Sequence, residues 1–221
     1  MERIKPNIII LGPQGSGKST QSDILADKYG FQQISIGNIA RKIIASKSTI
    51  GKEMKKYESA GNLIPDSIII KDVLEPTLKK IAKKNGLVFD GIPRNEKQTK
   101  LFINTLTKCK IAIPYLIYLS IPPSVAKQRI ADRRICSICG KIHSSSKKKL
   151  ALAKCSKCGN VLDARSDDQD EKIIQKRLDI FYKNSKKIID YFKKIKHYIY
   201  INGNPSIKKV NSEIISKINQ L

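Results

Sequence analysis

The chain has 221 residues, of which 40% are hydrophobic, and this is enough to bury the core of one domain that carries small inserts. No stretch approaches a membrane span, which needs roughly 18 consecutive apolar residues. The first residues, Met1 to Pro6, lead directly into a strand and fit no signal peptide, so we expect a cytoplasmic protein.

The formal net charge of +24 normally indicates a polyanion as partner. However, Lys residues outnumber Arg residues by 35 to eight and are spread through every segment, which favours a solvated basic surface over a dedicated nucleic-acid face. Because only Arg offers phosphate a planar fork, each Arg in this chain is a candidate phosphate contact. The eight are Arg3, Arg41, Arg94, Arg129, Arg133, Arg134, Arg165 and Arg177.

Residues 7–20 contain the first predicted strand, Ile8 to Leu11, followed by Gly12 to Ser19, which fit the phosphate-loop pattern G-x-x-x-x-G-K-[ST]. Glycines let consecutive backbone N–H groups point at one anion. Lys18 is expected to reach the β- and γ-phosphates, and the hydroxyl of Ser19 suits a Mg²⁺ ligand. A glycine turn without a ligand is the alternative, but the strand before the loop and the amphipathic helix after it favour a phosphate site.

The remaining strands alternate with helical patterns, which predicts an α/β fold: a parallel five-stranded sheet with helices on both faces. The strands are predicted at 7–11, 33–36, 87–90, 115–120 and 198–202. The helices are predicted at about 18–29, as two short segments within 38–62, at about 66–84 with an interruption at Pro76, at 95–108, at about 169–195, and after Pro205. Ligands bind such sheets beyond the carboxyl ends of the strands, where the phosphate loop, Gly37 and Asp90-Gly91 would meet.

Four of the five cysteines form two C-x2-C pairs, Cys136 with Cys139 and Cys155 with Cys158, each followed by a glycine. This spacing is typical of a structural four-thiolate zinc site, with a tight turn at Gly140 and Gly159. Two disulfides are the competing interpretation, and a cytoplasmic location disfavours them.

Taken together, these motifs resemble those of adenylate kinases, in the form with a zinc-bearing lid found mainly in some bacteria. The resemblance covers nearly the whole chain. The stretches that carry it are the phosphate loop, Gln33–Arg41, Gly61–Asp66, Phe89–Arg94 with Gln98, Arg129–Cys136, the four-cysteine insert, Ala164–Asp168, Lys176–Leu178 and Asn202-Gly203. Asp-Gly-x-Pro-Arg at the end of the third strand is specific to nucleoside monophosphate kinases.

The resemblance implies three parts. Residues 1–34, 65–131 and 169–221 would form a core that binds ATP, residues 35–64 a helical insert that binds the monophosphate, and residues 132–168 a zinc-binding lid.

The resemblance also implies roles for individual residues. ATP would contact Gly15, Ser16, Gly17, Lys18, Ser19, Thr20, Arg129, Arg133 and Pro205. AMP would contact Ile36, Gly37, Arg41, Asn62, Leu63, Ile64, Gly91, Ile92, Pro93, Arg94, Gln98, Arg165 and Arg177, with Gln98 reading the adenine edge. Catalysis would depend on Lys18, Asp90, Arg94, Arg133, Arg165 and Arg177. Zinc would be bound by Cys136, Cys139, Cys155 and Cys158.

The implied activity is that of a phosphotransferase of nucleotide biosynthesis, ATP + AMP ⇌ 2 ADP, in a monomer that binds neither nucleic acid nor a membrane. Asp90 would lie near Mg²⁺ bound with ATP; a turn carboxylate at the end of a strand is its structural alternative. Closure of the lid would exclude water, which otherwise competes as the phosphoryl acceptor.

Three departures from the family pattern bear on these expectations. Ser19 replaces a glycine. Ile36 replaces a threonine that helps to recognise AMP, and beside it Asn38 replaces an aspartate. The segment between Asp168 and Arg177 is one residue longer than usual. One alternative is therefore a kinase of UMP or CMP. The other is a zinc-ribbon protein that binds nucleic acid, but such a protein needs neither the phosphate loop nor Asp90–Arg94.

Overall fold

The computed structural model describes residues 5–81, 86–144, 154–164, 168 and 170–221. Its centre is a five-stranded sheet in the order β2-β3-β1-β4-β8, in which every neighbouring pair is parallel. The strands are β1 (Ile8–Leu11), β2 (Gln32–Ser35), β3 (Leu87–Asp90), β4 (Tyr115–Ser120) and β8 (Tyr198–Asn202). The predicted α/β fold with a parallel five-stranded sheet is thus confirmed, and each predicted strand lies within one residue of its observed bounds.

β1 is apolar throughout because both faces of the sheet are covered, so all four of its side chains are buried. Ile8 and Ile10 contribute to an apolar cluster on one face, whereas Ile9 and Leu11 contribute to a larger cluster on the other. The register pairs Ile10 with Asp90 and Asp90 with Ser35, so the carboxyl ends of β1, β2 and β3 meet at one edge.

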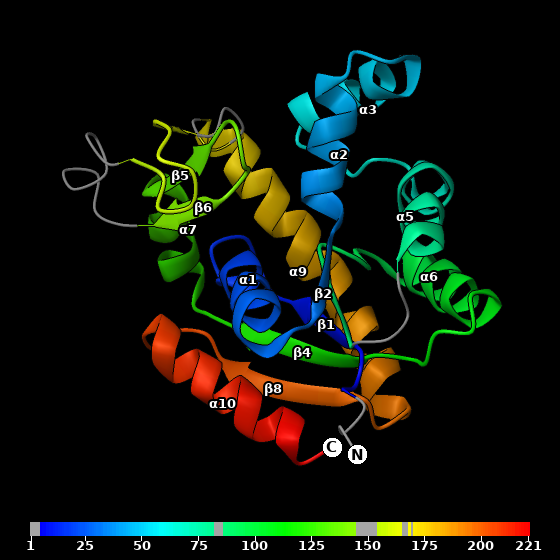
Figure 1. Cartoon of the computed structure of the whole chain (residues 1–221). Coiled ribbons are helices and arrows are strands. Elements are labelled where there is room, and N and C mark those ends of the chain that lie inside the picture. Colours follow the sequence, from blue (N-terminus) through cyan, green and yellow to red (C-terminus); the bar gives the residue numbers. More distant parts are fainter. Residues whose placement is uncertain (1–4, 82–85, 145–153, 165–167, 169) are drawn as a thin grey trace.

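Helices cover both faces of the sheet (Figure 1). α1 (Lys18–Tyr29) and α10 (Ile207–Asn219) pack against each other and supply Leu25, Val210 and Ile214 to the smaller cluster. The larger cluster receives residues from α6 (Glu96–Lys108) and α9 (Glu171–Lys194), among them Phe102, Ile188 and Phe192. α7 (Pro123–Ala131) follows β4.

The helix predicted at 66–84 is divided, as Pro76 requires. It begins as α4 (Asp66–Ile68), widens into a π-helix, η1 (Ile69–Leu74), and ends as α5 (Glu75–Lys80). Proline has no N–H and its ring crowds the preceding turn. The wider turn accommodates it, and the N–H of Glu75 donates to the carbonyl of Ile70, five residues back. Within the described residues the run stops at Lys80, four residues before the predicted end.

Two smaller units project from the edge where the strand ends meet (Figure 1). One is the helix pair α2 (Ile36–Ala45) and α3 (Thr49–Ser59). The other is an antiparallel sheet in the order β6-β5-β7, made of β5 (Arg133–Cys136), β6 (Ile142–Ser144) and β7 (Leu162–Ala164). Among the described helices, none is long and apolar enough to cross a bilayer.

Candidate functional site

The loop between β1 and α1 holds Lys18 in a half-buried position at the start of the helix. Gly17 precedes it at φ 95° and Gly15 has φ 83°, conformations that side chains with a Cβ rarely adopt. The ammonium group of Lys18 donates to the carbonyls of Gly12 at 2.7 Å and Pro13 at 2.8 Å. Burial lowers the pKa of Lys18 to about 7, against the opposing effect of the Asp90 carboxylate. This amine therefore lacks an anionic partner strong enough to offset its desolvation.

Ser19 and Asp90 come together from two different elements. The hydroxyl of Ser19 donates to Oδ2 of Asp90 at 2.6 Å, and the hydroxyl of Ser35 lies 3.4 Å from the same oxygen. Asp90 is 5% exposed and ends β3, directly across the sheet from the end of β1. A hydroxyl beside a carboxylate offers the hard oxygen ligands that Mg²⁺ prefers, so this pair fits a magnesium site next to the phosphate loop.

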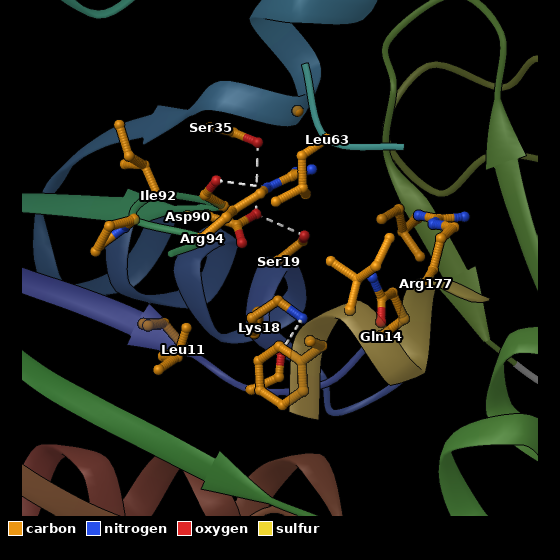
Figure 2. A pocket seen from close by; sticks show the side chains of 18 of the residues that line it. Leu11, Gln14, Lys18, Ser19, Ser35, Leu63, Asp90, Ile92, Arg94 and Arg177 are labelled. Carbon is orange, nitrogen blue, oxygen red and sulfur yellow. Dashed lines mark hydrogen bonds between the residues drawn. The ribbon is translucent and has the colours of Figure 1, made fainter. Parts of the chain in front are cut away.

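The phosphate loop opens into a cleft of about 920 Å³, its open mouth included, in which several cationic side chains converge (Figure 2). Arg41 comes from α2, Arg94 from the segment after β3, Arg133 from β5 and Arg177 from α9. The polar lining of the cleft comprises Gln14, Lys18, Ser19, Ser35, Arg41, Asp90, Arg94, Arg133 and Arg177. Such a concentration of positive charge suits a ligand with several phosphate groups.

Two of these arginines share one carboxylate. Nε and Nη2 of Arg133 each lie 2.6 Å from Asp168, which is 4% exposed, and Nη1 of Arg177 lies 3.3 Å from it. Asp168 thus joins the first strand of the small sheet to α9. It therefore pairs with cations of both units.

A second, smaller pocket lies beside the cleft, between α2 and the segments around Ile64 and Gly91. Its walls include Ile36, Gly37, Ala40, Ile64 and Ile69. Gln98 is the amide in this lining and is 1% exposed. Arg41, Asn62, Leu63, Arg94 and Arg177 line a neighbouring pocket that shares Gly37, Ala40 and Ile64 with the first. Most of the predicted acceptor residues therefore line these two adjoining pockets, together called the apolar recess, whose arginines are Arg41, Arg94 and Arg177. Ile92 and Pro93 line the main cleft instead.

Arg129 connects the phosphate loop to the turn after β8. Its guanidinium donates to the carbonyl of Gly203 at 3.0 Å and of Asn204 at 2.9 Å, with the carbonyl of Gly15 at 3.4 Å. Partial burial lowers its pKa from the usual value. Pro205 adjoins this turn, so Arg129 and Pro205, which were both predicted to contact ATP, are close in space.

The sulfur atoms of the four predicted cysteines lie within 4.8 Å of one another. Cys136 lies 3.4 Å from Cys158 and Cys139 lies 3.5 Å from Cys155, too far for S–S bonds. Gly140 and Gly159 adopt the left-handed conformation, at φ 70° and 75°. Despite burial, hydrogen bonds from the backbone of Lys157 and Cys158 lower the pKa of Cys155 to about 5. Despite an opposing backbone hydrogen bond, the neighbouring thiols raise the pKa of Cys158 to about 12. The closeness of the four sulfurs, rather than the pKa of any one thiol, is what suits the cluster to hold a metal ion.

Nearly all predicted site residues lie around the cleft, its neighbouring pockets or the cysteine cluster. Arg129 and Pro205 lie instead at the turn after β8, and Arg165 lies outside the described residues. Gln14 and Asp66 are among the residues at the site that had no role in the sequence interpretation. Gln14 lies within the phosphate-loop motif, and its buried Oε1 accepts no hydrogen bond from the described residues. Asp66, the last residue of the motif Gly61–Asp66, contacts Gln98 at 2.8 Å. Their positions within these two motifs are the sequence signal that could have identified both residues.

Comparison with known proteins agrees with this geometry. A family model described as "Adenylate kinase" matches residues 10–197. The chain is 38% identical to an adenylate kinase of Pyrococcus horikoshii, over 92% of this chain and 91% of the relative. It is 36% identical to one of Desulfovibrio desulfuricans, over 96% and 99%, and 34% identical to one of Lawsonia intracellularis, over 96% of each. These matches do not favour a UMP or CMP kinase or a nucleic-acid-binding protein.

Proposed function

The chain belongs to the adenylate kinase family, and from this premise we propose how its residues catalyse the reversible reaction ATP + AMP ⇌ 2 ADP. The observation that carries the proposal is the convergence of Lys18, Arg94, Arg133 and Arg177 on one cleft, with the phosphate loop on one side and an apolar recess on the other.

ATP is proposed to bind with its phosphates in the loop Gly15–Thr20. The backbone N–H groups at the start of α1 face the polyphosphate, and the helix dipole favours negative charge there. Lys18 exchanges its two carbonyl contacts for the β- and γ-phosphates. Arg129 and Pro205 flank the nucleoside end, next to the turn after β8.

AMP is proposed to bind in the recess formed by residues 35–64 and the segment Gly91–Gln98. The apolar walls around Ile36 and Ile64 suit the faces of a nucleobase, and Gln98 meets its edge. Arg41, Arg94 and Arg177 then face the α-phosphate at the mouth. Arg165 is proposed to join them from the lid.

The reaction forms a bond between an oxygen of the AMP phosphate and the γ-phosphorus of ATP, and it breaks the bond from that phosphorus to the β–γ bridging oxygen. The attacking group is already anionic, so no strong general base is needed. The work of the protein is to align two polyanions and to stabilise charge on the moving group. Lys18 lies on the donor side and Arg94 on the acceptor side of the cleft, whereas Arg133 and Arg177 reach it from the lid strand and α9.

Adenylate kinases use Mg²⁺ with ATP, and Ser19 and Asp90 are the residues proposed to hold it, directly or through water. When bound, the ion neutralises charge on the β- and γ-phosphates. The hydrogen bond from Ser19 to Asp90 keeps both oxygens in place in the ligand-free protein.

The four-cysteine unit is proposed to bind zinc in a structural role. Four thiolates complete a tetrahedral shell and leave no position for substrate or water. The ion would stabilise residues 132–168 as a lid over the ATP phosphates, which excludes water from the γ-phosphorus. Cysteines that bind a metal instead of forming disulfides are consistent with the reducing cytoplasm, where we place the protein. We further propose that it acts as a monomer and has no nucleic-acid partner.

ADP formation tests the proposal. A zinc-loaded preparation is given ATP and Mg²⁺ with AMP, GMP, UMP or CMP as separate acceptors. We expect fast turnover with AMP and much slower turnover with the other three. Comparable rates with UMP or CMP would contradict the assigned acceptor site, and absence of transfer to AMP would overturn the reaction itself.

A further inference from the structure

Two hydrogen-bond partners hold the side-chain amide of Gln98, and neither can exchange its role as donor or acceptor. The backbone N–H of Arg94 donates to Oε1 at 2.8 Å. Nε2 donates to Oδ1 of Asp66, also at 2.8 Å. A backbone N–H only donates and a carboxylate only accepts, so these partners fix which end of the amide is oxygen. Rotating the amide by 180° would oppose N–H to N–H and oxygen to carboxylate.

Asp66 is itself held in place by Asn95. Nδ2 of Asn95 lies 3.0 and 3.3 Å from the two carboxylate oxygens. Oδ1 of Asn95 accepts from the backbone N–H of Gln98 at 2.7 Å and so caps α6. The three side chains interlock across the start of α6 and the start of α4, two segments about 30 residues apart in sequence.

The fixed amide presents a defined pattern to the apolar recess that it lines. An amide has two N–H groups and two oxygen lone pairs. Within the described residues, the contact with Asp66 uses one N–H group and the contact with Arg94 uses one oxygen lone pair. One N–H donor and one oxygen acceptor therefore remain for a ligand. Adenine carries a 6-amino donor beside the N1 acceptor and complements this pattern, whereas a 6-oxo purine carries an acceptor beside an N1–H donor and opposes it.

We infer that Asp66 is a positioning residue that locks Gln98 in the orientation that accepts a 6-amino base and rejects a 6-oxo base. The inference rests on the proposed contact between Gln98 and the acceptor base, and it adds the side chain that fixes the polarity of that contact together with the backbone N–H of Arg94. Inosine monophosphate is the matched probe, because it differs from AMP in replacing the 6-amino group by an oxo group and placing a proton on N1.

The test measures dissociation constants of AMP and inosine monophosphate by calorimetry, together with transfer to each from ATP. The wild type is expected to prefer AMP by about a hundredfold or more, because a mismatched base leaves buried polar groups unpaired. Asp66→Asn removes the charged acceptor and is expected to lower this preference by about tenfold, mainly through the KM for the monophosphate, with the KM for ATP unchanged.

A double-mutant cycle separates positioning from a general structural effect. Gln98→Ala is expected to abolish most of the preference, and adding Asp66→Asn to it is then expected to change the ratio little. Asp72→Asn is the matched control, since Asp72 is an exposed carboxylate in the same helical run. Asn95→Ser keeps a capping oxygen for α6 but removes the hydrogen bonds that hold Asp66. This variant is expected to prefer AMP over inosine monophosphate less strongly than the wild type. It replaces Asp66→Asn as the test if Asp66→Asn does not fold.

Each outcome has one meaning. The lock is overturned if Asp66→Asn keeps the wild-type ratio, or if it lowers the ratio equally in the Gln98→Ala background. An unchanged ratio in Asn95→Ser also counts against it. Preferential binding of AMP that depends on both Asp66 and Gln98, without any phosphoryl transfer, would overturn the proposed reaction and leave the lock standing. Equal binding of AMP and inosine monophosphate by the wild type would overturn the lock.

Discussion

In the five-stranded sheet every residue of β1 is buried, and two apolar clusters pack against its faces. In the small sheet β6-β5-β7, which belongs to the proposed lid, the buried cluster among the described residues consists of Cys136, Cys155 and Leu162. The first unit is held by apolar burial, which needs no ligand. The second buries too little to be stable by itself and depends on four side chains that converge on one point. The two units should therefore respond differently to the same perturbation.

The largest effect is expected from Lys18→Met, which leaves the sheet intact and removes the buried ammonium. Transfer from ATP to AMP should fall by about a thousandfold, because charge on the moving phosphoryl group loses a preorganised partner. Steady-state kinetics measure the loss, and circular dichroism checks the fold. Lys28→Met, at an exposed position of the same helix, is the control and should keep wild-type activity. A Lys18 variant with more than a tenth of that activity would contradict the proposed role.

Removal of the metal should destabilise the small sheet β6-β5-β7 without destabilising the five-stranded sheet. A thiophilic chelator, or Cys155→Ser, is expected to raise amide hydrogen exchange in β5, β6 and β7 while leaving β1 and β4 protected. Transfer should fall by about ten- to a hundredfold, because an unstable lid admits water and misplaces Arg133. Metal analysis of the wild type should give one zinc ion per chain. Cys109→Ser, outside the cluster, serves as control. If hydrogen exchange rises equally in the small sheet and in the five-stranded sheet, the metal does not stabilise the small sheet selectively, and the prediction is wrong.

Asp168→Asn tests the connection between the lid and the core. The variant leaves Arg133 and Arg177 without their shared buried carboxylate. We expect about a tenfold loss in kcat/KM for ATP and a loss of about 2 kcal/mol in unfolding free energy, since removing one partner of a buried ion pair is costly. Asp163→Asn, an exposed carboxylate on β7, is the matched control. If the two variants behave alike in kinetics and thermal melts, the ion pairs of Asp168 with Arg133 and Arg177 have no role in closing the proposed lid over the core.

The smallest effect concerns protons. With a pKa of about 7 in the ligand-free fold, Lys18 is largely neutral at pH 8.5. Phosphates favour the charged amine and raise its pKa, so binding of ATP at pH 8.5 should take up as much as about one proton, and less at pH 6. Calorimetry in buffers of different ionisation enthalpy measures this uptake. Lys18→Met should abolish it, and uptake that persists in the variant would assign the proton to another group.

The same pKa predicts a dependence of stability on pH. The folded value of about 7 lies below the ordinary value of 10.5, so burial of the charged amine destabilises the ligand-free fold fully below pH 7. This penalty is relieved as pH rises from 7 toward 10.5, because the unfolded chain binds the extra proton in that window. Lys18→Met should therefore raise the melting temperature more at pH 6 than at pH 10. An equal shift at both values would contradict the lowered pKa.

Much of the fold and of the candidate site was predictable because it is encoded in short stretches. Apolar runs give the buried strands, the glycine pattern of residues 12–19 gives the phosphate loop, and the two C-x2-C pairs give the metal cluster. The helix predicted at about 66–84 was expected to be interrupted at Pro76, since the missing N–H is a local property. Its widening into a π-helix was not predicted.

The sequence by itself thus determined the five strands of the central sheet, most of the helices, the family resemblance and the cationic side chains around the cleft, because strand and helix periods, loop backbone and ligand spacing are local. It did not predict α7 or the strands β5, β6 and β7. Only the tertiary structure decided which distant groups meet. The pairing of Asp168 with Arg133 and Arg177, the approach of Ser19 to Asp90 and the locking of Gln98 by Asp66 join residues from separate elements. The lowered pKa of Lys18 likewise results from burial. Such contacts depend on how the elements pack in three dimensions, which spacing along the chain does not encode.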